Sequence, residues 1–214
     1  MSAVLGTASL PRVATGGPPP RDPRARAASI GLWVFMGVAT SLFSLFTWAY
    51  VMRMSGSDAI TLSLPSQLWL STALLLAGSV ALQLAAGAAR EAVGIAAAWR
   101  ARRLLLAGGL CALAFLASQL WAWQVMLAAQ VQPTSHPAGS FFYLLTAMHA
   151  LHLAGGLVGW AWAAWAAWAY PAAGAWRIAL CARYWHFMLA VWLGLFALLR
   201  WLTPEVARFI CGTA

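Results

Sequence analysis

Charge is scarce in this sequence, and lysine is missing altogether. Only 8% of the 214 residues are charged, four residues are acidic, and all thirteen basic residues are arginine. Because average soluble domains carry roughly 25% charged residues, this composition excludes a water-facing globular surface. Hydrophobic residues supply 63% of the chain, and its mean hydropathy is +0.78. The composition therefore predicts an integral membrane protein.

Alternating apolar strands and paired cysteines are also missing. The apolar runs are long and continuous, which excludes a β-barrel built from alternating segments of about ten residues. Cys111, Cys181 and Cys211 match neither metal-ligand spacing nor a disulfide framework, so we interpret them as small apolar residues. The net charge is +9, but the arginines lie at the ends of apolar runs rather than among aromatic residues. This pattern predicts no nucleic-acid partner.

Five apolar runs are each long enough for a transmembrane helix, which needs about 20 residues. We expect an all-α bundle of five membrane-spanning helices, at about residues 29–52, 67–89, 104–129, 139–169 and 178–202. The predicted organisation is a disordered or extended cytoplasmic tail over 1–27, the five-helix domain over 28–203, and a short outer tail over 204–214. A basic loop with Arg100, Arg102 and Arg103 is expected before the third helix.

The arginines also predict the orientation in the membrane. With the N-terminus inside, ten arginines fall in inner segments and three in outer segments, and inner loops of membrane proteins carry the excess of positive charge. The inner set is Arg12, Arg21, Arg24, Arg26, Arg90, Arg100, Arg102, Arg103, Arg177 and Arg183, and the outer set is Arg53, Arg200 and Arg208. We therefore expect an inner N-terminus and an outer C-terminus. For Trp162, Trp165 and Trp168, anchoring at the interface is favoured over a ligand site.

Histidines are the polar residues of most interest within the spans, because all four acidic residues lie in tails or loops. His149 and His152 are three residues apart on one helix face, and His186 enters the last helix at a similar depth. Imidazole suits haem iron, copper or zinc, so metal ligation is one interpretation. The favoured interpretation is neutral rings hydrogen-bonded to neighbouring helices, with Thr40, Ser41, Ser44 and Tyr184 as candidate partners for the pair.

Two motifs resemble subunit III of the haem-copper oxidases. The stretch 140–156, SFFYLLTAMHALHLAGG, resembles the signature helix of that family, and it holds Phe141, Phe142, Thr146, His149, His152, Gly155 and Gly156. The segment Tyr184-Trp185-His186-Phe187, followed by Trp192, resembles the last helix of the family. Span 29–52 is similar to the third helix of seven-helix members, so the chain resembles the five-helix bacterial form.

The chain departs from the family pattern at two positions. The family commonly has a membrane-embedded glutamate where this sequence has Ala39, and an aspartate where it has Leu189. Roles in proton handling or lipid binding that the family assigns to these carboxylates are therefore not expected of this chain.

The resemblance implies an accessory subunit of an oxidoreductase complex in the bacterial inner membrane. It implies that the chain packs on subunit I, with subunit II and small subunits in the same complex, and sustains the proton-coupled reduction of oxygen to water in aerobic respiration. Haem and copper are expected in the partner subunits and not in this chain, which has no catalytic, cofactor or metal site of its own. Bound phospholipid is expected, and the motif residues are expected to make packing or lipid contacts.

Two alternatives remain open at the level of sequence. One is an accessory protein of a nitric oxide reductase system. The other is a small haem-binding membrane anchor, in which His149 or His152 would pair with His186 as axial ligands.

Overall fold

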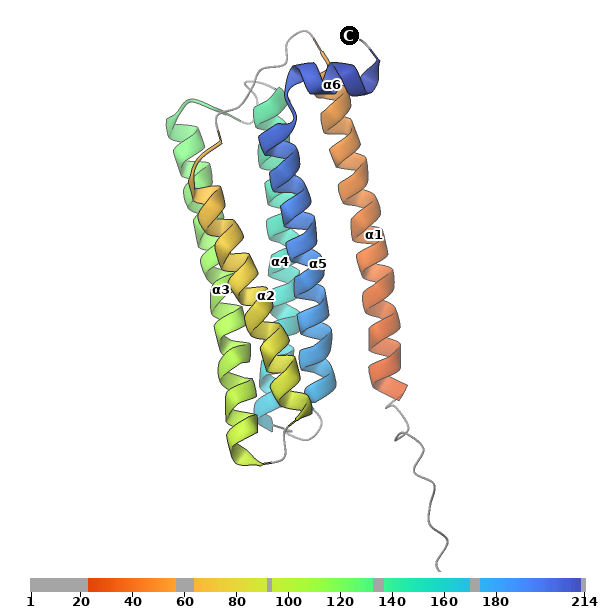
Figure 1. Ribbon diagram of the computed structural model, residues 1–214, viewed down its shortest axis with the longest axis vertical. Coiled ribbons are helices and arrows are strands. Elements are labelled where there is room, and N and C mark those ends of the chain that lie inside the picture. The colour runs from red at the N-terminus through yellow and green to blue at the C-terminus, as the bar shows by residue number, and fades with distance from the viewer. Residues whose placement is uncertain (1–22, 57–63, 92–93, 133–136, 170–173, 213–214) are drawn as a thin grey trace, which may run out of the picture.

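The computed structural model describes residues 23–56, 64–91, 94–132, 137–169 and 174–212, and within these ranges it contains six α-helices and no strand (Figure 1). The helices are α1 (Pro23–Met54), α2 (Gln67–Arg90), α3 (Ile95–Ala128), α4 (Pro137–Ala169), α5 (Ala175–Trp201) and α6 (Pro204–Cys211). The first five are long and apolar enough to cross a membrane. The prediction of an all-α bundle with five membrane-spanning helices is confirmed.

The start of α3 corrects one prediction. Arg100, Arg102 and Arg103, expected in a loop, lie within the first three turns of α3, which begins at Ile95 after Gly94. The physical reason is helix propensity, because alanine and arginine are strong helix formers. Gly94 precedes the helix at the N-cap with a positive φ of 116°, which glycine adopts without strain. Residues 23–27, expected in the tail, are the first residues of α1, so that part of the prediction is wrong. Residues 1–22 lie outside the described residues, and the tail expected there stays a prediction.

A short sixth helix follows the last span. Thr203 caps its first turn by accepting a hydrogen bond from the backbone N–H of Val206 at 3.3 Å, and Pro204 occupies the first turn. Gly212 ends the helix in the left-handed conformation that glycine adopts without strain. In Figure 1, α6 lies across the end of the bundle above α5, and it contacts α1.

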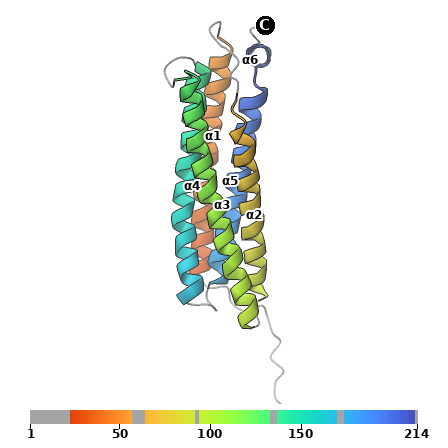
Figure 2. The same ribbon diagram turned by 90° about the vertical axis from the view of Figure 1, so that its left-hand side faces the viewer.

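The helices run alternately along one axis, with α2 and α3 making the most extensive contact (Figures 1 and 2). α5 packs on α2, α4 and α1, so it is the helix that joins the others. α1 stands at the side of the bundle, where it contacts α4, α5 and α6. The bundle is therefore a four-helix group with α1 attached along one flank.

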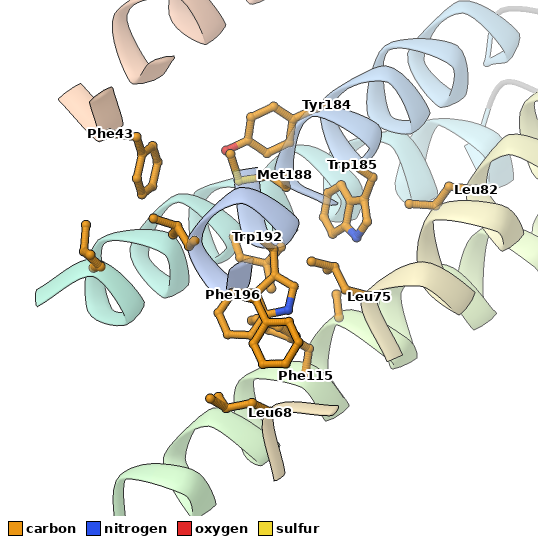
Figure 3. Close-up of a cluster of buried hydrophobic side chains, with 14 of the residues drawn as sticks. Phe43, Leu68, Leu75, Leu82, Phe115, Tyr184, Trp185, Met188, Trp192 and Phe196 are labelled. Atoms are coloured by element: carbon orange, nitrogen blue, oxygen red, sulfur yellow. The ribbon is translucent and has the colours of Figure 1, made fainter. Parts of the chain in front are cut away.

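Aromatic side chains fill the centre of the bundle (Figure 3). The ring of Trp192 stacks on Phe196 at an interplanar angle of 7°, and its centroid lies 5.0 Å from that of Phe115 in an edge-to-face arrangement. Such aromatic pairs contribute about 0.5–1.5 kcal/mol beyond the area that they bury. These contacts pack α3 against α5, and the buried core around them includes residues of all five long helices.

The arginines of the described residues divide unequally between the two ends of the bundle. Eight lie toward the end where α1 begins, and three lie toward the end that carries α6. The first group is Arg24, Arg26, Arg90, Arg100, Arg102, Arg103, Arg177 and Arg183, and the second is Arg53, Arg200 and Arg208. Arg12 and Arg21 lie outside the described residues.

Two glycines allow the close approach of α2 and α3. A Cβ atom on Gly108 would lie 2.5 Å from the Cγ of Leu82 and 3.3 Å from the carbonyl oxygen of Gly78. A Cβ atom on Gly78 would in turn lie 3.0 Å from the Cβ of Cys111. Close backbone contact at small residues is a main source of attraction between helices in lipid, where no hydrophobic force drives association.

This contact predicts the effect of Gly108→Val. We expect the free energy of unfolding in detergent to fall by about 1–3 kcal/mol, because the added side chain overlaps Leu82 and must separate two helices. Gly87→Val is the matched control, since a Cβ at Gly87 meets no atom within 4 Å among the described residues. Thermal unfolding followed by tryptophan fluorescence measures both variants. An equal loss of stability in the two variants would contradict the role given to Gly108.

Candidate functional site

The histidine motif lies on the inward face of α4. Thr146, His149, Leu153 and Gly156 are all buried, and their spacing of three or four residues places them in one line along the helix. This line faces α1, α3 and α5, and it brings the signature motif of α4 against the Tyr184–Phe187 motif of α5. The two sequence motifs that suggested the family are therefore neighbours in the fold.

His149 is enclosed by aromatic rings from three other helices. Its ring centroid lies 6.3 Å from that of Phe43 on α1, 5.6 Å from Phe115 on α3 and 5.2 Å from Trp192 on α5. The side chain is fully buried, and neither ring nitrogen has a hydrogen-bond partner among the described residues. His149 thus packs as an aromatic side chain at the point where four helices meet.

The expected hydrogen bonds of the histidine pair need correction. Two of the expected partners, Thr40 and Ser41, instead bond to carbonyl oxygens one turn earlier in their own helix, at 2.8 and 3.1 Å. Hydroxyl side chains in a helix commonly donate their proton to a carbonyl oxygen of the same helix, and that proton is then not available to a neighbouring helix. The prediction that His149 is hydrogen-bonded within the bundle is wrong.

His152 lies one turn farther along α4 and is half-buried. Its Nδ1 atom lies 2.8 Å from the carbonyl oxygen of Met148, within its own helix. Tyr184 does reach this residue, but its hydroxyl donates to the backbone carbonyl of His152 at 2.8 Å rather than to the ring. Rings of Phe35 and Phe43 on α1 lie 6.0 and 5.2 Å from the His152 ring. His152 thus helps to hold α1 and α5 against α4.

His186 lies on α5 and forms its hydrogen bonds with α2. Its Nδ1 lies 2.5 Å from the hydroxyl oxygen of Ser79, and its Nε2 lies 3.0 Å from the amide oxygen Oε1 of Gln83. Both partners are on α2, so this histidine joins α5 to α2. The expectation that its ring bonds to a neighbouring helix is confirmed.

The other motif residues are packing contacts. The ring of Phe141 lies 5.4 Å from that of Tyr50 on α1, and Phe142 is fully buried. Thr146 accepts a hydrogen bond from the indole N–H of Trp123 at 3.0 Å, and the indole N–H of Trp192 donates to Thr72 at 2.9 Å. These bonds join α3 to α4 and α5 to α2.

Close packing explains why α4 has a glycine at position 156, the second of the pair Gly155-Gly156. A Cβ on Gly156 would lie 2.5 Å from the Cε1 of Tyr184, whereas a Cβ on Gly155 would meet no atom within 4 Å among the described residues. Trp185 is fully buried beside Gly156, and the half-buried Phe187 has its ring 6.4 Å from that of Tyr184. Gly156 therefore admits the aromatic pair of α5, while Gly155 leaves open space.

The two positions where the family commonly has carboxylates are apolar and lie in the packed bundle. Ala39 is 1% exposed and shares the inward face of α1 with Met36 and Phe43. Leu189 is half-buried and packs against the core. Glu91 and Glu205, the acidic residues that the structure describes, lie at the ends of α2 and α6, so the described spans hold no carboxylate. Asp22 and Asp58 lie outside the described residues.

The three histidines do not converge on a metal or haem. Both ring nitrogens of His186 bond to α2, while His149 is surrounded by aromatic rings on the inward face of α4. Axial ligation would need His186 to break both bonds and turn through the bundle. In the part of the chain that the structure describes, no group of three His, Cys, Asp or Glu side chains is placed to hold a metal ion.

A cleft opens beside the motif, between α1, α4 and the first turns of α5. Its volume is about 540 Å³, and its walls include the open positions Gly31, Gly155 and Gly159. Most of the other lining residues are apolar. At its arginine-rich end, the guanidinium of Arg177 lies 4.7 Å from the ring of Trp162 and 4.8 Å from that of Trp176. The cleft thus combines an apolar trough with one cation at the end of the bundle.

Tryptophan–arginine pairs also fix the arginine-rich end of α3. The guanidinium of Arg102 lies 5.5 Å from the ring of Trp99 and 5.4 Å from that of Trp168, and its Nε donates to the carbonyl oxygen of Ala167 at 3.0 Å. Trp162, Trp165 and Trp168 are all exposed on α4. Trp162 and Trp168 therefore pair with arginines, which is a role that their spacing alone did not suggest.

Sequence reasoning missed a polar cluster between α2 and α3. The hydroxyls of Ser71 and Ser118 lie 2.7 Å apart, and the side-chain amide of Gln119 donates to Ser71 at 2.9 Å. All three side chains are buried. The signal was present, because Ser71 and the pair Ser118-Gln119 are polar residues inside apolar runs, where such residues usually face another helix.

The fold and the site define a multi-pass helical membrane protein whose two sequence motifs form one packed junction. No family model matches the chain. A segment of it is 32% identical over 85 residues to a protein of Nocardia farcinica described as "Probable cytochrome c oxidase subunit 3", which covers 39% of this chain and 42% of the relative. Proteins of Mycobacterium bovis and Mycobacterium tuberculosis with the same description are 29% identical over 100 residues, 46% of this chain and 49% of each relative.

These matches confirm the resemblance to the subunit III family. The matched segments span about half the length of the curated relatives. The cytochrome c oxidase description belongs to those relatives.

The contrast between two histidines gives a testable prediction. His149→Leu should leave the free energy of unfolding unchanged or raise it by up to about 1 kcal/mol, because no hydrogen bond is lost and a polar ring leaves an apolar site. His186→Leu, the matched control, should lower it by about 1 kcal/mol, because two bonds to α2 are lost. Unfolding in mixed detergent and dodecyl sulfate measures both. A larger loss for His149→Leu than for His186→Leu would contradict the absence of a hydrogen bond at His149.

Proposed function

We propose that this chain is an accessory subunit III of a haem-copper oxidase in aerobic respiration, packed on the subunit that holds the oxygen-reducing centre. The observation that carries the proposal is the junction of the two family motifs, in which Gly156 of α4 receives Tyr184 and Trp185 of α5. Similarity to the bacterial relatives supports the same assignment. Subunit II and small subunits would belong to the same complex.

The orientation that fits this role places the arginine-rich end in the cytoplasm of a bacterium. Eight arginines near the start of α1, against three at the end with α6, support it by the positive-inside rule. The chain is then a multi-pass protein of the bacterial inner membrane, with the N-terminus inside and α6 on the outer surface. Exposed Val206, Phe209 and Ile210 suit α6 to the apolar side of that interface.

The chemistry of the complex would lie outside this chain. The described spans hold no carboxylate, and Ala39 and Leu189 replace the acidic groups that the family commonly carries. We therefore assign proton transfer, haem and copper to the partner subunits. The contribution of this chain is mechanical, because a packed five-helix partner keeps the proton-uptake side of the catalytic subunit ordered during turnover.

This role predicts the outcome of deleting the chain. Haem and copper spectra of the remaining oxidase should stay unchanged, and the initial rate of oxygen consumption should be near normal, because no redox group is removed. Activity should then decay several times faster during continuous turnover, because the catalytic subunit has lost a packed neighbour. Oxygen consumption against time, with a haem and metal assay, measures this. Loss of a haem or copper centre on deletion would contradict the accessory role.

The cleft between α1, α4 and α5 is the part of the molecule best suited to phospholipid. Its trough is floored by glycines and lined mostly by apolar side chains, which suits an acyl chain. The Arg177 guanidinium, which lies against the rings of Trp162 and Trp176, is placed where a phosphate headgroup would sit at the inner interface. We assign the expected bound phospholipid to this cleft.

Filling the trough tests the lipid assignment. Gly159→Leu should reduce the phospholipid that co-purifies with the chain, because a Cβ at this position meets no atom within 4 Å among the described residues and the longer side chain would occupy the cleft. Gly37→Leu on α1 is the matched control, since its Cβ also meets no atom within 4 Å and Gly37 does not line the cleft. Organic phosphorus per chain, measured after detergent washing, gives the result. Equal phosphorus in both variants and the unaltered protein would contradict the assignment.

A further inference from the structure

Polar side chains are exposed in the middle of the membrane span on one face of the bundle. Ser79 lies twelve residues after Gln67 and eleven before Arg90, so it marks the midpoint of α2. At 1.5 Å per residue this depth is about 17 Å from either end, inside the hydrocarbon of a bilayer about 30 Å thick. His186 and Gln83, which bond to one another at this level, are both exposed on the surface of the chain.

The hydrogen bonds among Ser79, His186 and Gln83 leave one donor group unused. The arrangement that uses every other proton has the Ser79 hydroxyl donating to Nδ1 of His186, and the Nε2–H of His186 donating to Oε1 of Gln83. The amide N–H₂ of Gln83 then has no acceptor among the described residues and is exposed to the membrane. Lipid tails offer no acceptor at this depth, and an unsatisfied polar group there is costly.

Two exposed hydroxyl groups in the spans do not raise this problem. Thr40 and Ser41 are exposed on α1, but each donates to a carbonyl oxygen of its own helix. Apart from Thr40, Ser41 and Ser44, the outward side of α1 is mainly apolar, with Val34, Val38 and Leu45 exposed. That face suits lipid, whereas the face around Gln83 calls for a protein partner.

The surroundings of Gln83 permit a helix to approach closely. The exposed positions of α2 and α5 beside it, which we name the α2/α5 face, are Val80, Gln83, His186, Ala190, Leu193 and Gly194. A Cβ on Gly194 would meet no atom within 4 Å among the described residues. Figure 1 shows α2 and α5 side by side along the bundle, so the face is continuous over both helices. Small residues with an interhelical hydrogen bond are the usual components of a membrane helix interface.

We infer that the α2/α5 face docks a transmembrane helix of the catalytic oxidase subunit, and that this helix supplies a hydrogen-bond acceptor to the amide of Gln83 at mid-membrane depth. The acceptor is a hydroxyl, amide, carboxylate or kinked-backbone carbonyl oxygen, because the free groups of Gln83 are donors. This inference rests on the proposed function and adds to it the face and the residue through which the subunits meet.

Two variants test the face by assembly in the full complex. Gly194→Leu should reduce the haem-bearing subunit that co-purifies with the tagged chain by about tenfold or more, because the added side chain blocks close approach. Gln83→Met, which keeps the size of the side chain and removes the amide, should reduce it by about threefold. Gly37→Leu is the matched control on α1 and should retain the partner. Retention of the partner by Gly194→Leu at the level of Gly37→Leu overturns the inference and leaves the proposed function standing.

Photo-crosslinking identifies the occupant of the face directly. A photoreactive benzoylphenylalanine in place of Ala190 should form an adduct with the haem-bearing subunit, identified by its peptides, while the same group in place of Gly37 should not. An adduct of twice the 22.8 kDa chain mass would reveal a second copy on the face and overturn the inference. An assembled complex without a protein adduct from position 190 would show a lipid-facing surface and also overturn it. If the unaltered chain brings down no haem-bearing subunit, the proposed function fails, and the inference fails with it.

Discussion

The scarcity of hydrogen-bond partners in hydrocarbon is the constraint on which this structure depends. In the described spans, most polar side chains are paired either within their own helix, as for Thr40 and Ser41, or with a facing helix, as for Ser71 with Ser118 and His186 with Ser79. Bonds of the second kind contribute only about 0.6 kcal/mol each on average, but they select which helix faces which and at what level. Glycine contacts, such as Gly108 on Leu82 and Gly156 on Tyr184, then let the selected pairs close.

The same constraint gives the histidines three different roles. His186 joins α5 to α2 through both ring nitrogens, and His152 lies where α1 and α5 meet α4. His149 makes no hydrogen bond within the described residues and is held by the rings of Phe43, Phe115 and Trp192. The three histidines thus lie at different contacts between helices rather than together at a metal site. This arrangement is consistent with a subunit whose contribution is packing.

The number, order and approximate bounds of the spanning helices followed from the apolar runs, because hydrocarbon thickness sets the length of each run. The prediction of a loop around Arg100 was wrong. Arginines lower the local hydropathy and so suggested the end of the span, but the backbone is helical from Ile95. The position of His149 inside a membrane span could be predicted from the sequence. Its lack of a hydrogen bond could not, because it depends on three rings from distant parts of the chain. Pairing of Arg102 with Trp168 and of Arg177 with Trp162 likewise depends on how the first turns of α3 and α5 lie against the last turns of α4.

The central claim is that the chain is a packed, redox-inactive partner of a haem-bearing subunit. Purification of the tagged chain from membranes of aerobically grown cells in mild detergent tests it most directly, with an absorption spectrum and peptide identification of every polypeptide recovered. The account predicts a haem spectrum that follows a second, larger polypeptide in constant ratio to this chain and disappears when stringent detergent separates the two. Recovery of the chain alone, or of haem that stays with the isolated chain after separation, would contradict it.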